Sequence, residues 1–213
     1  MEAAPSHGTD AKKKSLCASE RNRPDVIEAR ERFQRRMRRW AANKLVFIDE
    51  SGVNLALTRS QAWGPRGERV VDDVPAGRWE AYSVIAALRE DGVTAPMVLR
   101  GAMETQSMLA WVRTQLAPTL RRGDIVVLDN VRFHDDPEIA ELIARRGARL
   151  EFLPPYSPDL NPIEEAWSKM KTMLRAAKAR VLEALVGALD EALSAISSQD
   201  CHGWFQHAGY RVS

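Results

Sequence analysis

The sequence predicts a mixed α/β domain of three layers, with helices on both faces of a partly parallel sheet. Short apolar runs alternate with helical patterns in the second half of the chain, which is the order typical of parallel strands joined by helices. The first half contains a strand meander, because residues 81–88 and 93–99 flank the hairpin signal Glu90-Asp91-Gly92. Together these patterns indicate a mixed sheet that is covered on both faces.

The chain begins with a polar lead-in and a basic amphipathic helix. Residues 1–24 contain few apolar side chains, so we expect them to be flexible. From Asp25 onward, apolar residues recur three and four positions apart, which is the period of a helix with one buried face. This stripe consists of Val26, Ala29, Phe33, Met37 and Trp40.

The remaining elements follow from apolar runs and turn residues. Residues 45–49 form a short buried strand, and the Gly/Pro-containing stretch 62–67 marks a turn. Pro96 makes 93–99 an edge strand or a bulged one. Further strands are expected at 124–128 and 149–153, and helices at 104–116, 137–146, 162–178 and 182–196. The expected segments are 1–43 for the lead-in and helix, 44–200 for the α/β domain and 201–213 for a C-terminal tail.

Composition is that of one globular domain. The 213 residues are 45% hydrophobic and 28% charged, and no apolar run approaches the ~20 residues that a membrane span needs. We therefore expect no membrane association. Cys17 and Cys201 lie near opposite ends of the chain, which favours free thiols in a reducing cytoplasm over a disulfide framework. The tryptophans Trp63, Trp79, Trp111 and Trp167 are expected to lie in the core.

Charge is distributed unevenly along the chain. Residues 1–44 contain twelve Lys and Arg against six Asp and Glu, a net charge of +6, so a total of +2 leaves −4 for the remainder. A basic arm on an acidic body suits a polyanionic partner such as DNA. A solvated helix face is the alternative explanation. The candidate DNA-binding residues are Lys12, Lys13, Lys14, Arg35, Arg36, Arg38 and Arg39.

Two predicted strands end in acidic residues. Asp49 closes the run LVFID, and Asp129 follows the run IVVL. The carboxyl ends of parallel strands meet at one edge of a sheet, where α/β folds place their sites. For each aspartate taken alone, a turn or a helix cap is the commoner explanation. Two of them beside a positioned glutamate indicate a site.

The glutamate follows the proline-rich stretch LPPYSPDLNP. Asn161 as N-cap and Pro162 as the first helical residue would place Glu164 in a capping box, a purely structural explanation. The position of each residue around the helix distinguishes the two neighbouring glutamates. At ~100° per residue, Glu164 lies at the border of the apolar stripe, whereas Glu165 points to solvent. We therefore choose Glu164 as the third acid of the site.

Three carboxylates in one place repel one another unless a cation joins them. Hard oxygen ligands suit Mg²⁺ or Mn²⁺, which also bind phosphate oxygens of a substrate. Two such ions about 3.5–4 Å apart can hold the attacking and leaving oxygens of an in-line phosphoryl displacement. We expect two ions at Asp49, Asp129 and Glu164.

The blocks LVFIDESG, VVLDNVRFH and LPPYSPDLNPIEEAW resemble the three motif blocks of the mariner superfamily of transposases, in its bacterial insertion-sequence branch. The signature of that family is Asp, Asp and Glu with 34 residues between the last two, and 34 residues separate Asp129 from Glu164. The resemblance covers roughly residues 44–178. It implies a ribonuclease H-like fold, cut-and-paste DNA transposition, dependence on Mg²⁺ and TA target sites.

The resemblance also implies roles for individual residues. Asp49, Asp129 and Glu164 would be metal ligands, and water, then a DNA 3′-hydroxyl, would be the nucleophile. Glu50 and Asn130 are neighbours expected to orient these ligands through hydrogen bonds. His134 matches a histidine that the family places five residues after the second Asp, although a capping or packing role explains it as well.

The chain therefore resembles the catalytic part of a DNA transposase. The implied partners are double-stranded DNA at element ends and target, and a second copy of the chain when assembled on DNA. The implied location is the bacterial cytoplasm, at the nucleoid. Two alternatives remain open: a catalytically silent transposase remnant that binds DNA or a partner transposase, and another nuclease of the same fold, such as a resolvase or ribonuclease H.

Overall fold

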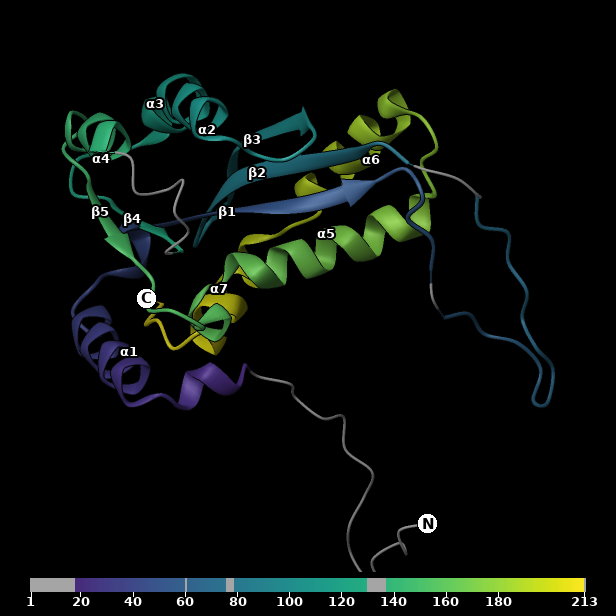
Figure 1. Cartoon of the computed structure of the whole chain (residues 1–213), viewed down its shortest axis with the longest axis horizontal. Helices are drawn as coiled ribbons and strands as arrows, with labels where there is room; N and C mark the ends of the chain where they lie inside the picture. Colours follow the sequence, from purple (N-terminus) through teal and green to yellow (C-terminus); the bar gives the residue numbers. More distant parts are fainter. Residues whose placement is uncertain (1–17, 60, 76–78, 130–136, 213) are drawn as a thin grey trace, which may run out of the picture.

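The computed structural model describes residues 18–59, 61–75, 79–129 and 137–212. It confirms the predicted fold class, because a five-stranded mixed sheet in the order β3-β2-β1-β4-β5 lies between two layers of helices (Figure 1). β1 pairs antiparallel with β2 and parallel with β4, while β2–β3 is antiparallel and β4–β5 parallel. The strands are β1 (Leu45–Asn54), β2 (Ala81–Arg89), β3 (Gly92–Arg100), β4 (Ile125–Leu128) and β5 (Arg149–Phe152).

Helices cover both faces of the sheet. One layer contains α2 (Thr105–Trp111), a π-helical turn (Val112–Leu116), α3 (Ala117–Thr119) and α4 (Pro137–Ala144). The other contains α1 (Pro24–Met37), α5 (Ile163–Ala177), α6 (Leu182–Ser194) and α7 (Ser198–His207), and short 3-10 turns span Ser19–Asn22, Ala42–Lys44 and Pro158–Leu160. In the described part of the chain no helix is both long and apolar enough to cross a membrane.

The sheet divides the interior into two apolar cores. Leu45 and Phe47 of β1 face the core under α1 and α5–α7, whereas Val46 and Ile48 face the core under α2–α4. This alternation follows from the two-residue period of a strand. It places the side chain of Asp49, next in the series, on the same face as Phe47 and therefore on the side of α5.

Two local predictions about the sheet hold and one about a helix needs correction. β3 is an edge strand, and the ladder is irregular between Ile85 and Ala87 of β2, opposite Ala95 and Pro96. The missing N–H of proline accounts for both features. The predicted helix 104–116 changes to a π-helical turn after α2.

The C-terminal tail predicted from residue 201 needs correction too. Residues 201–207 lie within α7, which opens with a capping box formed by Ser197 and Asp200. Phe205 of α7 packs edge-to-face on Phe47, with ring centroids 5.3 Å apart, and Tyr210 packs on the same ring at 5.0 Å. The segment has too few apolar residues to show a regular helical stripe in the sequence. A few aromatic contacts with β1 bury this helix in place of such a stripe.

Tryptophans divide between the core and the surface. Trp111 and Trp167 are buried as predicted, and Trp79 packs partly against the core. Trp63 is fully exposed, contrary to prediction. It belongs to residues 61–75, between β1 and β2, which extend away from the body (Figure 1) and have no helix or strand of their own.

Candidate active site

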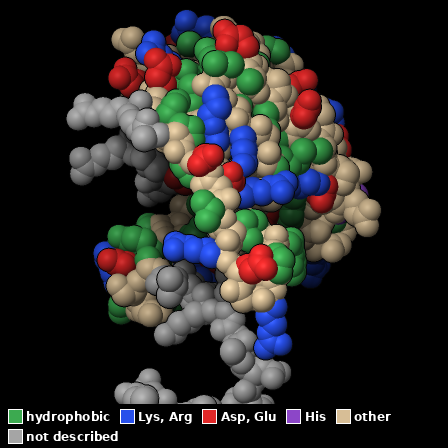
Figure 2. All heavy atoms as spheres, turned by 90° about the vertical axis from the view of Figure 1, so that its right-hand side faces the viewer, with side chains coloured by type: hydrophobic (Ala, Val, Ile, Leu, Met, Phe, Trp, Pro, Cys, Tyr) green, Lys and Arg blue, Asp and Glu red, His purple; other side chains and the backbone are tan. Residues whose placement is uncertain are grey.

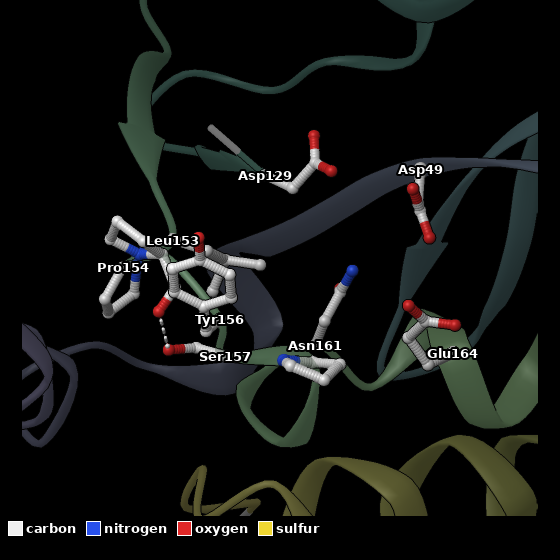
Figure 3. A pocket seen from close by; sticks show the side chains of 10 residues that line it. Asp49, Asp129, Leu153, Pro154, Tyr156, Ser157, Asn161 and Glu164 are labelled. Atoms are coloured by element: carbon white, nitrogen blue, oxygen red, sulfur yellow. Dashed lines mark hydrogen bonds between the residues drawn. The ribbon is translucent and has the colours of Figure 1, made fainter. Parts of the chain in front are cut away.

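One pocket of about 390 Å³ brings together the three acids selected from the sequence. Asp49, Asp129 and Glu164 line it with the loop residues 153–158 and Asn161. Figure 3 shows the three carboxylates projecting into the same space from β1, from the end of β4 and from α5. The expectation that these acids converge at one sheet edge is confirmed.

Strand register explains why the two aspartates are neighbours. Phe47 of β1 lies opposite Val127 of β4 in the parallel ladder. Two residues further along each strand the chain reaches Asp49 and Asp129, so both carboxylates leave the sheet at the same level. Because two residues are one full strand period, both also share the face of Phe47, under α5.

Helix α5 supplies the third acid without the predicted capping box. Pro162 is the N-cap residue and no side chain caps the helix, so Asn161 does not have the role expected for it. The Asn161 side chain is buried in the pocket wall instead, and its Oδ1 has no hydrogen-bond partner in the described part of the chain. Capping therefore does not account for Glu164, whose carboxylate faces the aspartates (Figure 3).

Glu165 is exposed, as is Glu164. Of the two, only Glu164 lines the pocket that contains Asp49 and Asp129. Glu165 lines a neighbouring hollow beside α7, together with Trp204 and His207. The choice of Glu164 over Glu165 thus agrees with the direction in which each side chain leaves α5.

Trp167 connects α5 to the first aspartate. Its indole Nε1 donates a hydrogen bond to Asp49 Oδ2 at 3.1 Å, and the ring is buried in the core. Trp167 lies three residues after Glu164, so both side chains leave nearly the same side of the helix. The sequence predicted only a core residue here, yet a buried indole N–H normally needs an acceptor.

The electrostatics of the pocket favour a cation. Burial raises the pKa of Asp49 to about 7, and repulsion by Glu164 and Asp129 adds to this shift, while hydrogen bonds from the Glu50 backbone and Trp167 oppose it. The pKa of Glu164 is also raised, mainly because the pocket partly withdraws its carboxylate from water although the residue as a whole is exposed, with Lys171 lowering the pKa and Asp129 raising it. A cation among these carboxylates would reverse both shifts.

The donor set suits a hard metal ion but is not closed around one. Carboxylate oxygens are what Mg²⁺ and Mn²⁺ prefer. Within the described ranges, no group of three or more His, Cys, Asp or Glu lies close enough to hold an ion as it stands. The three acids reach the pocket from three different elements, so side chains must move to bring all three onto one ion.

The remaining candidates near the site have different positions. Glu50 does not line the pocket, because its side chain leaves the opposite face of β1; its backbone, not its carboxylate, hydrogen-bonds Asp49. The role of the Glu50 side chain in orienting the ligands stays a prediction. Asn130 and His134 lie outside the described residues.

The candidate DNA-binding arginines lie on α1 and just after it. Arg35 pairs with Glu31 at 3.6 Å within the helix, and Arg36 pairs with Glu151 of β5 at 3.2 Å. Arg38 and Arg39 are exposed. Lys12, Lys13 and Lys14 lie outside the described residues. Figure 2 faces the side of the molecule that lies to the right in Figure 1, away from α1, and on that side Lys and Arg are interspersed with Asp and Glu.

Convergent carboxylates at the edge of a mixed α/β sheet are a donor set that suits a divalent cation. The sequence pattern of the DDE superfamily endonucleases matches residues 44–186, which is most of the chain. The chain belongs to that family.

Individual relatives are transposases. The chain is 26% identical to the Tcb1 transposase of Caenorhabditis briggsae over 194 residues, covering 84% of this chain and 68% of that protein. The Tcb2 transposase of the same organism is 29% identical over 188 residues, covering 81% and 66%.

Solved structures confirm the ribonuclease H-like fold. The catalytic domain of Mos1 mariner transposase superposes with a TM-score of 0.63 at 16% identity, covering 90% of each chain. A pre-cleavage Mos1 transpososome gives a TM-score of 0.75 at 15% identity, covering 94% of this chain and 64% of that one. The chain thus spans about two thirds of the longer Mos1 chain.

Proposed function

We propose that this chain is the catalytic part of a DNA transposase of the mariner type, from the bacterial insertion-sequence branch. The observation that carries the proposal is the convergence of Asp49, Asp129 and Glu164 in one pocket at the edge of the sheet. Membership of the DDE superfamily endonucleases and similarity to two transposases support it. The sequence motifs quoted above favour the bacterial branch.

The pocket residues would act by holding metal ions at the phosphate that reacts. Asp49, Asp129 and Glu164 would hold two Mg²⁺ or Mn²⁺ ions, which when bound supply charge for the phosphoryl transition state. Trp167 keeps Asp49 oriented through its indole N–H. Solved Mos1 complexes contain Mn or Mg, which is consistent with this choice of metals.

The reaction has two displacements at phosphorus. Water attacks first, and the bond between phosphorus and the 3′ oxygen breaks, since the released 3′-hydroxyl is the nucleophile of the second step. That hydroxyl then attacks a target phosphate; a new phosphodiester forms while the bond from that phosphorus to the 3′ oxygen of the target strand breaks, which leaves a free 3′-hydroxyl on the target. Both displacements are in line, so the same carboxylates serve both, and no covalent bond between protein and DNA forms.

The proposed partners are element-end and target DNA and a second copy of this chain on that DNA, at the bacterial nucleoid. The support is indirect: Mos1 transposase forms a paired-end complex with its left transposon end. The direct test is nicking of supercoiled DNA by the purified chain in Mn²⁺ or Mg²⁺, with EDTA as the control. Binding without nicking would favour a catalytically silent remnant.

We expect Arg38→Gln/Arg39→Gln to weaken non-specific duplex binding. If each of the two arginines neutralises one phosphate, the slope of log affinity against log salt becomes shallower by about 1.8 in the double variant, since each phosphate contributes about 0.9. Fluorescence anisotropy across a salt series measures this slope. Arg145→Gln is the matched control, because Arg145 is an exposed arginine paired with Glu141 on α4. An unchanged slope in the double variant would mean that these arginines are only solvated surface residues and do not contact DNA phosphates.

A further inference from the structure

The loop 153–161 determines where Glu164 lies. It forms most of the pocket wall and leads directly into α5. Tyr156 within it has a φ of 55°, in the left-handed region that residues other than glycine rarely adopt. Such a conformation persists only where surrounding contacts over-determine it. The loop therefore needs firm anchors.

Arg30 of α1 provides the main anchor. Its Nη1 donates to Ser157 Oγ at 2.6 Å and to Asp159 Oδ1 at 3.0 Å, and its Nη2 donates to Asp159 Oδ2 at 2.8 Å. Ser157 extends this hydrogen-bond chain into the loop, because its hydroxyl donates to the Pro155 carbonyl at 3.0 Å. Arg30 is only 8% exposed, although its helix is otherwise rich in solvated charge. A two-pronged guanidinium–carboxylate pair fixes geometry as well as distance.

Other contacts complete the anchoring. Arg21 also binds Asp159, at 2.9 Å. Burial would raise the pKa of Asp159, yet the hydrogen bonds and charge of Arg30, with the charge of Arg21, lower it. From the other side of the loop, the Tyr210 hydroxyl donates to the Leu160 carbonyl at 2.9 Å. Segments from both ends of the chain thus hold the loop that carries the site.

We propose that Arg30 is a positioning residue for the carboxylate pocket: by binding Ser157 and Asp159 it fixes the loop 153–161 and, through it, the approach of Glu164 to Asp49 and Asp129. Its consequence for cleavage rests on the proposed function. Helix α1 then has a second role, since it supports the site in addition to contributing basic charge.

The test compares Arg30→Met with Arg36→Met. Both remove an arginine that ties α1 to the body, but Arg36 binds Glu151 of β5 and not the loop. Hydrogen exchange of residues 153–164, Mn²⁺ affinity by calorimetry and the rate of Mn²⁺-dependent nicking are measured below the melting temperature of both variants. For Arg30→Met we expect faster exchange and a 10–100-fold loss in Mn²⁺ affinity and rate, roughly the effect of removing a residue that supports a metal ligand. Arg36→Met should match the parent in hydrogen exchange and Mn²⁺ affinity, the two measurements that a contribution of Arg36 to DNA binding does not affect.

Further variants separate positioning from folding. Arg30→Lys keeps the positive charge but cannot make the two-pronged contact with Asp159. Its hydrogen exchange, Mn²⁺ affinity and nicking rate should therefore lie between those of the parent and those of Arg30→Met. Asp159→Asn combined with Arg30→Met should lose less than the two single effects added together, because both changes remove the Arg30–Asp159 pair, while each also removes a contact of its own with Arg21 or Ser157. A lower melting temperature with unchanged exchange, Mn²⁺ affinity and rate would overturn the proposal and leave Arg30 a purely structural residue. If the parent itself does not nick DNA, the proposed function fails, while exchange and Mn²⁺ affinity still decide the role of Arg30.

Discussion

Asp129→Asn and Glu164→Gln should each lower the rate of Mn²⁺-dependent nicking of supercoiled DNA by roughly 10³-fold. Each change removes from the pocket one of the carboxylates that we propose as metal ligands. Metal-ion charge stabilisation is worth several kcal/mol, and about 1.36 kcal/mol corresponds to tenfold in rate. Initial rates on a fixed plasmid concentration measure the effect.

Glu165→Gln is the matched control, because it removes the adjacent carboxylate, which lies outside the pocket of Asp49 and Asp129. It should nick at nearly the parental rate. Circular dichroism must show that all variants are folded, and Asp129→Asn should be neutral or slightly stabilising without metal, since a repelled charge is removed. Parental rates in Asp129→Asn, or its unfolding, would contradict the metal-ligand role.

In the absence of metal, Asp49 should make the protein less stable as pH rises. Its pKa is raised from 3.8 to about 7 in the folded chain, so between these values the unfolded chain ionises this group and the folded chain keeps it protonated. The stabilising contribution is therefore complete below about pH 4 and is lost as pH rises through 7. A shift of this size corresponds to at most about 4 kcal/mol in the free energy of unfolding.

Urea unfolding in EDTA at several pH values tests this. Asp49→Asn should have a flatter pH profile than the parent and be more stable at pH 8, and Mn²⁺ should raise the stability of the parent at that pH. Asp190→Asn, an exposed carboxylate on α6, controls for a general change in charge. Identical profiles for the parent and Asp49→Asn would show that the carboxylate ionises freely in the folded protein.

Local sequence patterns predicted much of the fold and the three acids of the candidate site. The run LVFID and the run IVVL followed by Asp129 place two acids at strand ends, and parallel pairing of β1 with β4 puts them side by side. Helix phase selected Glu164 over Glu165. These predictions succeeded because strand alternation and helix periodicity are properties of neighbouring residues. The capping box at Asn161 failed for the same reason: a local pattern was satisfied in sequence, but the backbone began the helix at Pro162.

The sequence by itself determined the class of fold, the three acids and their common edge of the sheet. Only the tertiary structure decided what holds those acids in place. Trp167 and Asp49 are 118 positions apart, and Arg30 and Asp159 are 129 apart. The packing of α7 on β1 through Phe205 and Phe47 is similarly remote. No period of two or 3.6 residues encodes such pairs, because their partners are set by how layers pack and by the need of buried polar groups for hydrogen bonds.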